Sequence, residues 1–330
     1  MGEETKRFDI VALGECLIDF VPSDFATADT VAFLGCPGGA PANVLVASAR
    51  LGLRTAFIGK VGADVFGTLL ADTLKKNGVD TASLIRTEAY PTTLAFVALD
   101  ASGDRSFSFY RTHTADVMLT PDEIDASLLA STPLFHFGSV SMTAEPSRSA
   151  TLHAVKIAKD HGALISYDPN LRELLWDSLN EAKEVIASAL PLADLVKLSE
   201  EELIFLTGIE DIESAMHTLF DALPMKLLVT TRGAGGSVGL NRGGLVEAAG
   251  LAVDVVDTIG AGDAFWGALL SRLHGRLDCV EELDRETLAE MLSFANAAGA
   301  LSTTTSGAIG SLPDEAHIAE LRATAGASSV

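Results

Sequence analysis

Short apolar runs alternate with longer segments of helical periodicity along this chain, and that alternation limits the fold more than any other feature. The runs are short and rich in aliphatic and β-branched residues, so they are predicted to be strands. They are Phe8–Gly14, Thr55–Gly62, Pro133–Gly138, Ala163–Tyr167, Asp194–Leu198 and Leu227–Thr231. Strands joined through helices pair in parallel and are covered by those helices. We therefore expect an α/β fold with a mostly parallel central sheet.

Helix signals are clear in two of the intervening segments. Pro41–Leu51 has proline in its first turn and stops at Gly52. Asp64–Asn77 places its large apolar residues on one face before Gly78. Both segments are predicted to be helices.

Two regions carry strand signals without intervening helices. Cys16–Val21 with Thr30–Cys36, and Thr92–Asp100 with Arg105–Arg111, are predicted to be strand pairs. Ala101-Ser102-Gly103 is predicted to be the hairpin turn of the second pair. These pairs predict a small second sheet beside the core, and sheets in that position often act as lids.

The charge balance narrows the possible partners. The chain has 23 Lys+Arg against 45 Asp+Glu and a formal net charge of -22, so we expect neither nucleic-acid nor membrane-surface binding. We find no uncharged apolar span of the ~18 residues that a membrane helix needs. The three cysteines form no CxxC pair, which predicts a reduced, cytoplasmic protein. The length of 330 residues allows one large domain or two.

A small-residue segment precedes a predicted helix near the C-terminus. A strand-like Leu251–Val256 leads into Asp257–Asp263, and the helix continues to about Gly275. The amides of Gly260, Ala261, Gly262 and Asp263 are then unpaired at a helix N-terminus, which predicts a site for a phosphoryl group. The Asp263 carboxylate can accept a proton from an attacking hydroxyl there. Alternatively, it is an acidic first-turn residue that the helix dipole favours.

A glycine pair precedes the first predicted helix. The amides of Gly38 and Gly39, together with the Asn43 side chain one turn into the helix, can bind sugar hydroxyls. The alternative is a tight turn that requires glycine, with Asn43 as an ordinary polar residue.

Together these segments resemble the two signatures of the ribokinase-like (PfkB) carbohydrate kinases, and further matches resemble the fructokinase branch. The matching segments are Gly14–Phe20, Pro37–Asn43, Phe57–Gly62, Phe109–Arg111, Ser166–Arg172 and Phe294–Ala297. The resemblance implies one domain over 1–330, with a three-layer core of about nine strands and a discontinuous β-sheet lid from about 15–40 and 92–111.

For the sugar, the resemblance implies contacts from Asp19, Gly38, Gly39 and Asn43, with Arg111 reaching in from the lid and Arg172 near the transferring phosphate. Asp19 alone could instead be a turn residue and Arg111 a solvated strand end. Asp168 and Asn170 follow a predicted strand at a spacing that suits a water-rich Mg²⁺ site. A turn with a surface arginine is the alternative reading of this segment.

Relatives often carry an Asn-x-x-Glu motif where this chain has Ser199–Glu202, so Glu202 is a candidate outer metal ligand or an ordinary first-turn acid. The resemblance also implies nucleotide contacts and a monovalent-cation site. The nucleotide residues are Lys197, Thr231, Gly233, Gly236 and Asn296. The implied ligands of K⁺ are Asp257, the Ile259 carbonyl and the segment Ser306–Ser311, with Ser311 among them.

The resemblance therefore implies an ATP-dependent sugar kinase that uses Mg²⁺ and converts fructose to fructose 6-phosphate, with Asp263 as the base. The strongest rival acceptor is 2-keto-3-deoxygluconate, whose carboxylate Arg111 and Arg172 could grip together. Ribose and adenosine are weaker rivals. A catalytically inactive binding protein of the fructokinase type is the alternative of another class. A homodimer formed through the lid is also expected.

The histidines offer no competing chemistry. The chain has 7 of them without an HExxH pattern, and it lacks the GxSxG of a nucleophile elbow.

Overall fold

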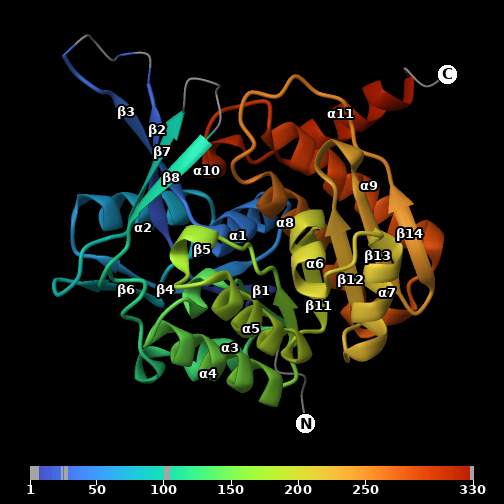
Figure 1. Cartoon of the computed structure of the whole chain (residues 1–330), viewed down its shortest axis with the longest axis horizontal. Coiled ribbons are helices and arrows are strands. Elements are labelled where there is room, and N and C mark those ends of the chain that lie inside the picture. Colours follow the sequence, from blue (N-terminus) through green and yellow to red (C-terminus); the bar gives the residue numbers. More distant parts are fainter. Residues whose placement is uncertain (1–6, 24, 26–28, 100–104, 328–330) are drawn as a thin grey trace.

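The core of the molecule is a ten-stranded sheet in the order β14-β13-β12-β11-β10-β9-β1-β4-β5, with β6 paired to β4 (Figure 1). The computed structural model describes residues 7–23, 25, 29–99 and 105–327. The strands are β1 (Ile10–Leu13), β4 (Thr55–Gly62), β5 (Val79–Asp80), β6 (Leu84–Thr87), β9 (Leu134–Phe137), β10 (Leu164–Tyr167), β11 (Leu195–Ser199), β12 (Leu227–Thr231), β13 (Ser237–Asn241) and β14 (Gly244–Ala248). Among the described residues its strands pair in parallel, except that β13 is antiparallel to both of its neighbours, β12 and β14. All the strands predicted from the apolar runs of the core are confirmed.

Helices cover both faces of this sheet, because consecutive residues of its parallel strands are apolar on both sides. Ile10 and Ala12 of β1 join one hydrophobic cluster, whereas Val11 and Leu13 join the other. One face is covered by α1 (Ala40–Arg50), α2 (Val65–Lys76), α8 (Ala261–Leu273), α9 (Arg285–Ser302), the short α10 (Ala308–Ser311) and α11 (Glu315–Ala327). The other is covered by α3 (Ala126–Ala130), α4 (Ser147–Asp160), α5 (Leu179–Ala189), α6 (Glu200–Thr207) and α7 (Ile212–Ala222). The expected three-layer α/β core is confirmed.

A separate four-stranded sheet stands off the core beside α1 and α2 (Figure 1). Its order is β3-β2-β7-β8, from β2 (Leu17–Pro22), β3 (Phe33–Gly38), β7 (Leu94–Leu99) and β8 (Arg105–Tyr110). The hairpins β2–β3 and β7–β8 are joined because β2 and β7 pair in parallel. The predicted small sheet is confirmed, while its predicted turn at 101–103 lies outside the described residues.

The strand-like segment Leu251–Val256 is not a strand, so that prediction was wrong. The amides of Val256 and Asp257 donate instead to the carbonyl oxygen of Thr303 at the end of α9, at 2.8 and 3.0 Å. Val255 and Val256 are each 61% exposed, so the apolar pattern reflects no buried sheet position. The segment carries the chain from the sheet edge to the start of α8.

No helix in the described ranges is long and apolar enough to cross a membrane.

Helices α1 and α8 pack closely, and a glycine makes this possible. A Cβ built on Gly267 of α8 would lie 2.6 Å from Ala47 Cβ and 2.7 Å from the Val44 carbonyl oxygen of α1. Ser48 of α1 donates its hydroxyl to the Gly267 carbonyl at 3.2 Å. The distance between the N-terminal turns of these helices therefore depends on position 267.

We expect Gly267→Ala to lower the free energy of unfolding by about 1–3 kcal/mol, because the new methyl group overlaps backbone atoms of a packed helix. Chemical denaturation measures this change. Gly275→Ala is the matched control, since a Cβ there meets no atom within 4 Å. Equal stability of the two variants would contradict the proposed close contact.

Candidate active site

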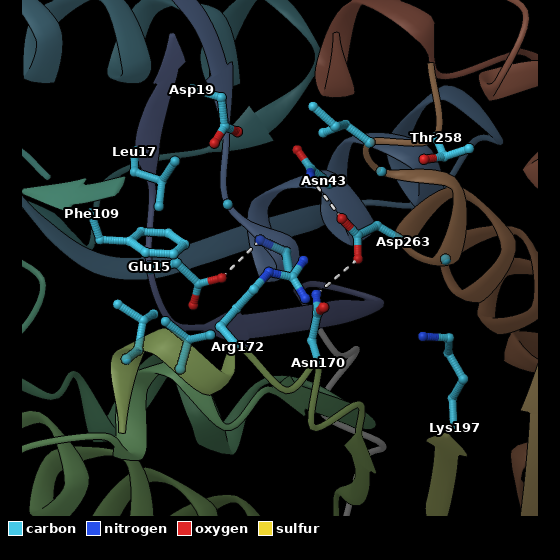
Figure 2. A pocket seen from close by; sticks show the side chains of 17 residues that line it. Glu15, Leu17, Asp19, Asn43, Phe109, Asn170, Arg172, Lys197, Thr258 and Asp263 are labelled. Carbon is cyan, nitrogen blue, oxygen red and sulfur yellow. Dashed lines mark hydrogen bonds between the residues drawn. The ribbon is translucent and has the colours of Figure 1, made fainter. Parts of the chain in front are cut away.

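A cavity of about 310 Å³ lies between the central sheet and the small sheet, where the parallel strands end (Figure 2). Loops at the carboxyl ends of parallel strands form ligand sites in α/β folds. The cavity brings together residues from distant parts of the chain. Among its lining residues are Glu15, Asp19, Gly39, Asn43, Asn170, Arg172, Lys197, Ile259, Gly260, Gly262 and Asp263.

Asp263 lies in the first turn of α8, which follows Gly260 in the left-handed conformation (φ 80°). The helix geometry leaves the amides of its first turn without intrahelical acceptors. Ala261 donates to the Thr258 carbonyl at 3.3 Å, so Gly262 and Asp263 supply the amides that are freest to meet an anion. The Ala261 amide, which was expected to bind the anion, is thus already hydrogen-bonded within the turn before α8.

Two amide side chains hold the Asp263 carboxylate (Figure 2). Asn43 Nδ2 donates to Oδ2 at 2.8 Å, and Asn170 Nδ2 donates to Oδ1 at 3.4 Å. Burial raises the pKa of Asp263 to about 6, and the charge of Asp168 adds to this, while Asn43, Lys197 and Arg172 oppose it. The carboxylate is therefore ionised at neutral pH and is able to accept a proton.

The loop after β10 carries the expected metal residues. Asp168 Oδ2 pairs with Lys197 Nζ at 2.7 Å, while its buried Oδ1 has no partner in the described part of the chain. Asn170 adopts φ 51°, which turns the chain toward Asp263. This backbone conformation is uncommon outside glycine and is best tolerated by asparagine. Among the described residues, no three His, Cys, Asp or Glu side chains gather as a metal cage.

Glu202 supports this loop from behind. Its Oε2 accepts from the Ser199 amide at 2.8 Å, and Oε1 accepts from the Leu171 amide at 2.7 Å. The first bond belongs to a capping box at the start of α6. With both oxygens bound to backbone amides, Glu202 is better placed to position the loop than to bind an ion directly.

The glycine pair allows the chain at the end of β3 to approach β2 and the residues just before it closely. A Cβ on Gly38 would lie 2.6 Å from Asp19 Oδ2, and one on Gly39 would lie 2.3 Å from the Glu15 carbonyl oxygen. Gly39 also has φ 117°. Burial raises the pKa of Asp19 to about 7; Arg172 lowers it, and Asp263 and Asp257 raise it. Of the pair, only Gly39 is among the lining residues of the cavity.

Arg111 is not among the residues that line the cavity, and its expected contact with the sugar stays a prediction. Its Nε donates to Asp116 Oδ2 at 2.7 Å, and its terminal nitrogens donate to Thr143 Oγ1 and the Val140 carbonyl. Val140 lines the cavity, so the guanidinium lies behind that wall. The position of Arg111 at the end of a predicted strand did not reveal its buried ion pair with Asp116.

Glu15 lines the cavity although no role was predicted for it. It is 4% exposed; Oε1 accepts from the Ala40 amide at 2.9 Å, and Oε2 has no partner among the described residues. Burial raises the pKa of Glu15 to about 7. The signal that could have identified Glu15 was a charged residue two positions after a fully apolar strand.

A second cavity of about 670 Å³ adjoins the first, and Thr258 and Gly262 line both. It brings together the expected nucleotide residues Thr231, Gly233, Gly236 and Asn296, whereas Lys197 lines the first cavity. Asn296 Nδ2 donates to the Ala248 and Ala249 carbonyls at 3.0 and 3.1 Å, so it also holds the cavity wall.

Asp257 joins two loops beside these cavities. Its Oδ1 accepts from the Ile259 amide at 2.9 Å, and its Oδ2 accepts from the Gly307 amide at 3.0 Å. Ser311 is buried and donates its hydroxyl to the Ala308 carbonyl at 2.9 Å. Asp257 thus ties the segment before α8 to the loop after α9.

The family model of the pfkB family carbohydrate kinases matches residues 7–315. The chain belongs to this family. It is a phosphotransferase with an alcohol acceptor, and the resemblance inferred from the sequence is confirmed. Fructokinase-1 of Zea mays is 48% identical over 314 residues, covering 94% of this chain and 97% of the maize protein.

Solved relatives have the same fold. Fructokinase with bound ATP from Xylella fastidiosa has a TM-score of 0.88 and 36% identity, with 96% of this chain and 98% of that chain covered. Fructokinase from Vibrio cholerae O395 with fructose, ADP and calcium ion has a TM-score of 0.85 and 37% identity, with 95% and 99% covered. A double mutant of the Vibrio enzyme was solved with fructose, ADP and potassium ion.

We expect kcat/KM for sugar phosphorylation to fall as the pH decreases through about 6, because the Asp263 carboxylate must be ionised to accept a proton. Asn43→Ala removes a donor that favours the ionised form, so the acid limb of the pH profile moves to higher pH. Glu15→Gln is the control, and it leaves the limb in place. A limb that follows Glu15 instead of Asn43 would contradict the assignment.

Proposed function

We propose that this protein transfers the γ-phosphoryl group of ATP to a hydroxyl of fructose, giving fructose 6-phosphate and ADP. The observation that carries this proposal is the position of Asp263. It lies on the cavity that faces the small sheet, and the neighbouring Gly262 is shared with the cavity of the nucleotide residues. A base at this boundary is adjacent to both reactants.

In the proposed reaction the sugar oxygen attacks the γ-phosphorus in line while the bond from that phosphorus to the bridging oxygen of ADP breaks. The hydroxyl proton passes to Asp263, and no phosphoenzyme forms. The amides of Gly262 and Asp263 at the α8 N-terminus, supplemented by that of Gly260, stabilise the negative charge on the transferring group. Arg172 and Lys197 add positive charge at the same cavity.

Asp19, Gly39 and Asn43 are proposed to bind the sugar. Asn43 Oδ1 is buried without a partner in the described chain and is therefore free to accept from a sugar hydroxyl. Gly38 contributes by admitting the Asp19 carboxylate at close range.

Asp168 and Asn170 are proposed to hold Mg²⁺, which the free Asp168 Oδ1 supports. When bound, the ion would offset the negative charge of the nucleotide phosphates. The loops that Asp257 joins are proposed to hold K⁺ through Asp257, the Ile259 carbonyl and the segment that ends at Ser311.

The proposal is tested by ADP release with fructose, 2-keto-3-deoxygluconate and ribose as acceptors. We expect fructose to give the highest kcat/KM, and Asp263→Asn to lower kcat by roughly 10²–10⁴-fold or more while fructose binding and melting temperature are retained. Asp221→Asn, an exposed change of the same kind in α7, is the control. No turnover with any sugar would contradict a kinase, and an active Asp263→Asn would exclude Asp263 as the base.

We further propose a homodimer that forms through the small sheet, in a reducing cytoplasmic environment. Leu34 is 53% exposed and Tyr110 65%, on the two open edge strands of that sheet, and Val31 beside β3 is 82% exposed. Apolar groups on unpaired strand edges favour association. The three free cysteines are compatible with a reducing compartment.

Leu34→Asp combined with Val31→Asp should convert a dimer to a monomer in multi-angle light scattering. Leu179→Asp, which changes an exposed leucine at the start of α5, should leave the mass unchanged. A wild-type monomer at assay concentrations would contradict the proposal.

A further inference from the structure

A buried ion pair lies directly behind the wall of the sugar cavity. The side chains of Arg111 and Asp116 are 7% and 3% exposed, and Arg111 Nε is 2.7 Å from Asp116 Oδ2. The other carboxylate oxygen, Oδ1, accepts hydrogen bonds from the hydroxyls of Thr93 and Thr114 at 2.5 and 2.8 Å. Burial raises the pKa of Asp116, but the charge of Arg111 and these hydrogen bonds outweigh it and keep the pKa below its ordinary value.

This arrangement uses every nitrogen of the Arg111 guanidinium. The terminal nitrogens bond to Thr143 Oγ1 at 2.6 Å and to the Val140 carbonyl at 3.0 Å. A guanidinium grips a substrate carboxylate through two parallel N–H groups, and both must be available. Three of the five N–H groups of Arg111 are used by these protein partners, one on each nitrogen, and together these bonds hold the guanidinium behind the cavity wall rather than among the lining residues.

The charges that remain at the cavity disfavour an anionic acceptor. Glu15, Asp19 and Asp263 line it as carboxyl groups, and the positive charge of Lys197 is paired with Asp168. Arg172 is exposed, and no carboxylate of the described residues forms an ion pair with it. A single unpaired guanidinium thus faces three carboxyl groups at the cavity.

We propose that Asp116 sets acceptor specificity, because it binds Arg111 and so denies the site the second guanidinium that would clamp a sugar acid. Asp116 is a positioning residue that acts through Arg111, and neutral polyols are accepted in preference to carboxylated sugars such as 2-keto-3-deoxygluconate. The inference rests on the proposed sugar kinase function.

Asp116→Asn tests this inference, since the amide retains the shape of the side chain and removes its charge. The quantity to measure is kcat/KM for 2-keto-3-deoxygluconate divided by kcat/KM for fructose. A charge-assisted hydrogen bond contributes about 1.5–3 kcal/mol, so we expect the ratio to rise roughly ten-fold or more, mainly through a lower KM for the acid. Adding Arg111→Gln to this variant should abolish the gain.

Glu123→Gln is the matched control, because it breaks another largely buried ion pair, Lys60–Glu123 at 2.6 Å, away from the cavity. It should leave the ratio unchanged. A folded Asp116→Asn with an unchanged ratio, a gain that survives Arg111→Gln, or the same gain in Glu123→Gln would overturn the inference.

The wild-type protein gives a test that does not depend on how the variants fold. Calorimetric titration in the presence of ADP should show weaker binding of 2-keto-3-deoxygluconate than of fructose, and equal or tighter binding of the acid would overturn the inference. A wild-type enzyme that prefers ribose contradicts only the proposed fructose specificity. In that case kcat/KM for 2-keto-3-deoxygluconate divided by kcat/KM for ribose should still rise in Asp116→Asn.

Discussion

The hydrogen bond between Asn43 and Asp263 is the contact on which the site depends. It joins residues 220 positions apart, from the first turns of α1 and α8, at 2.8 Å. Gly267 favours this bond, because it lets the two helices pack without a side chain between them. The N-terminal turn of α8 is therefore fixed over the strand ends, where both cavities meet, and a small change in helix packing would change the position of the base.

Burial and mutual repulsion give this site its electrostatic character. The pKa values of Glu15 and Asp19 rise to about 7 and that of Asp263 to about 6, in each case chiefly because the group is buried. The Asn43 amide, Lys197 and Arg172 favour the charged form of Asp263 and oppose the effect of its burial. The differing environments separate a group suited to accept a proton from groups suited to hydrogen-bond a sugar.

Much of the fold could be predicted because apolar periodicity reports burial, and burial decides which segments enter the sheet. Leu251–Val256 shows the limit, since Val255 and Val256 are exposed and the backbone of the segment bonds to Thr303. The position of the site could be predicted where carboxylates follow strands, as at Asp168 after β10, and where small residues precede a helix, as at Asp263. The surroundings of Arg111 could not be predicted, because they depend on its ion pair with Asp116. The Asp116 carboxylate in turn accepts hydrogen bonds from Thr93 and Thr114.

The central claim is that Asp263 faces the hydroxyl that receives the phosphoryl group. A crystal structure of Asp263→Asn with fructose and ATP tests it most directly, because the reaction is blocked while both reactants are present. The account predicts one sugar hydroxyl within about 3 Å of the side chain at position 263 and in line with the γ-phosphorus. A sugar bound with every hydroxyl beyond hydrogen-bonding distance of that side chain would contradict it.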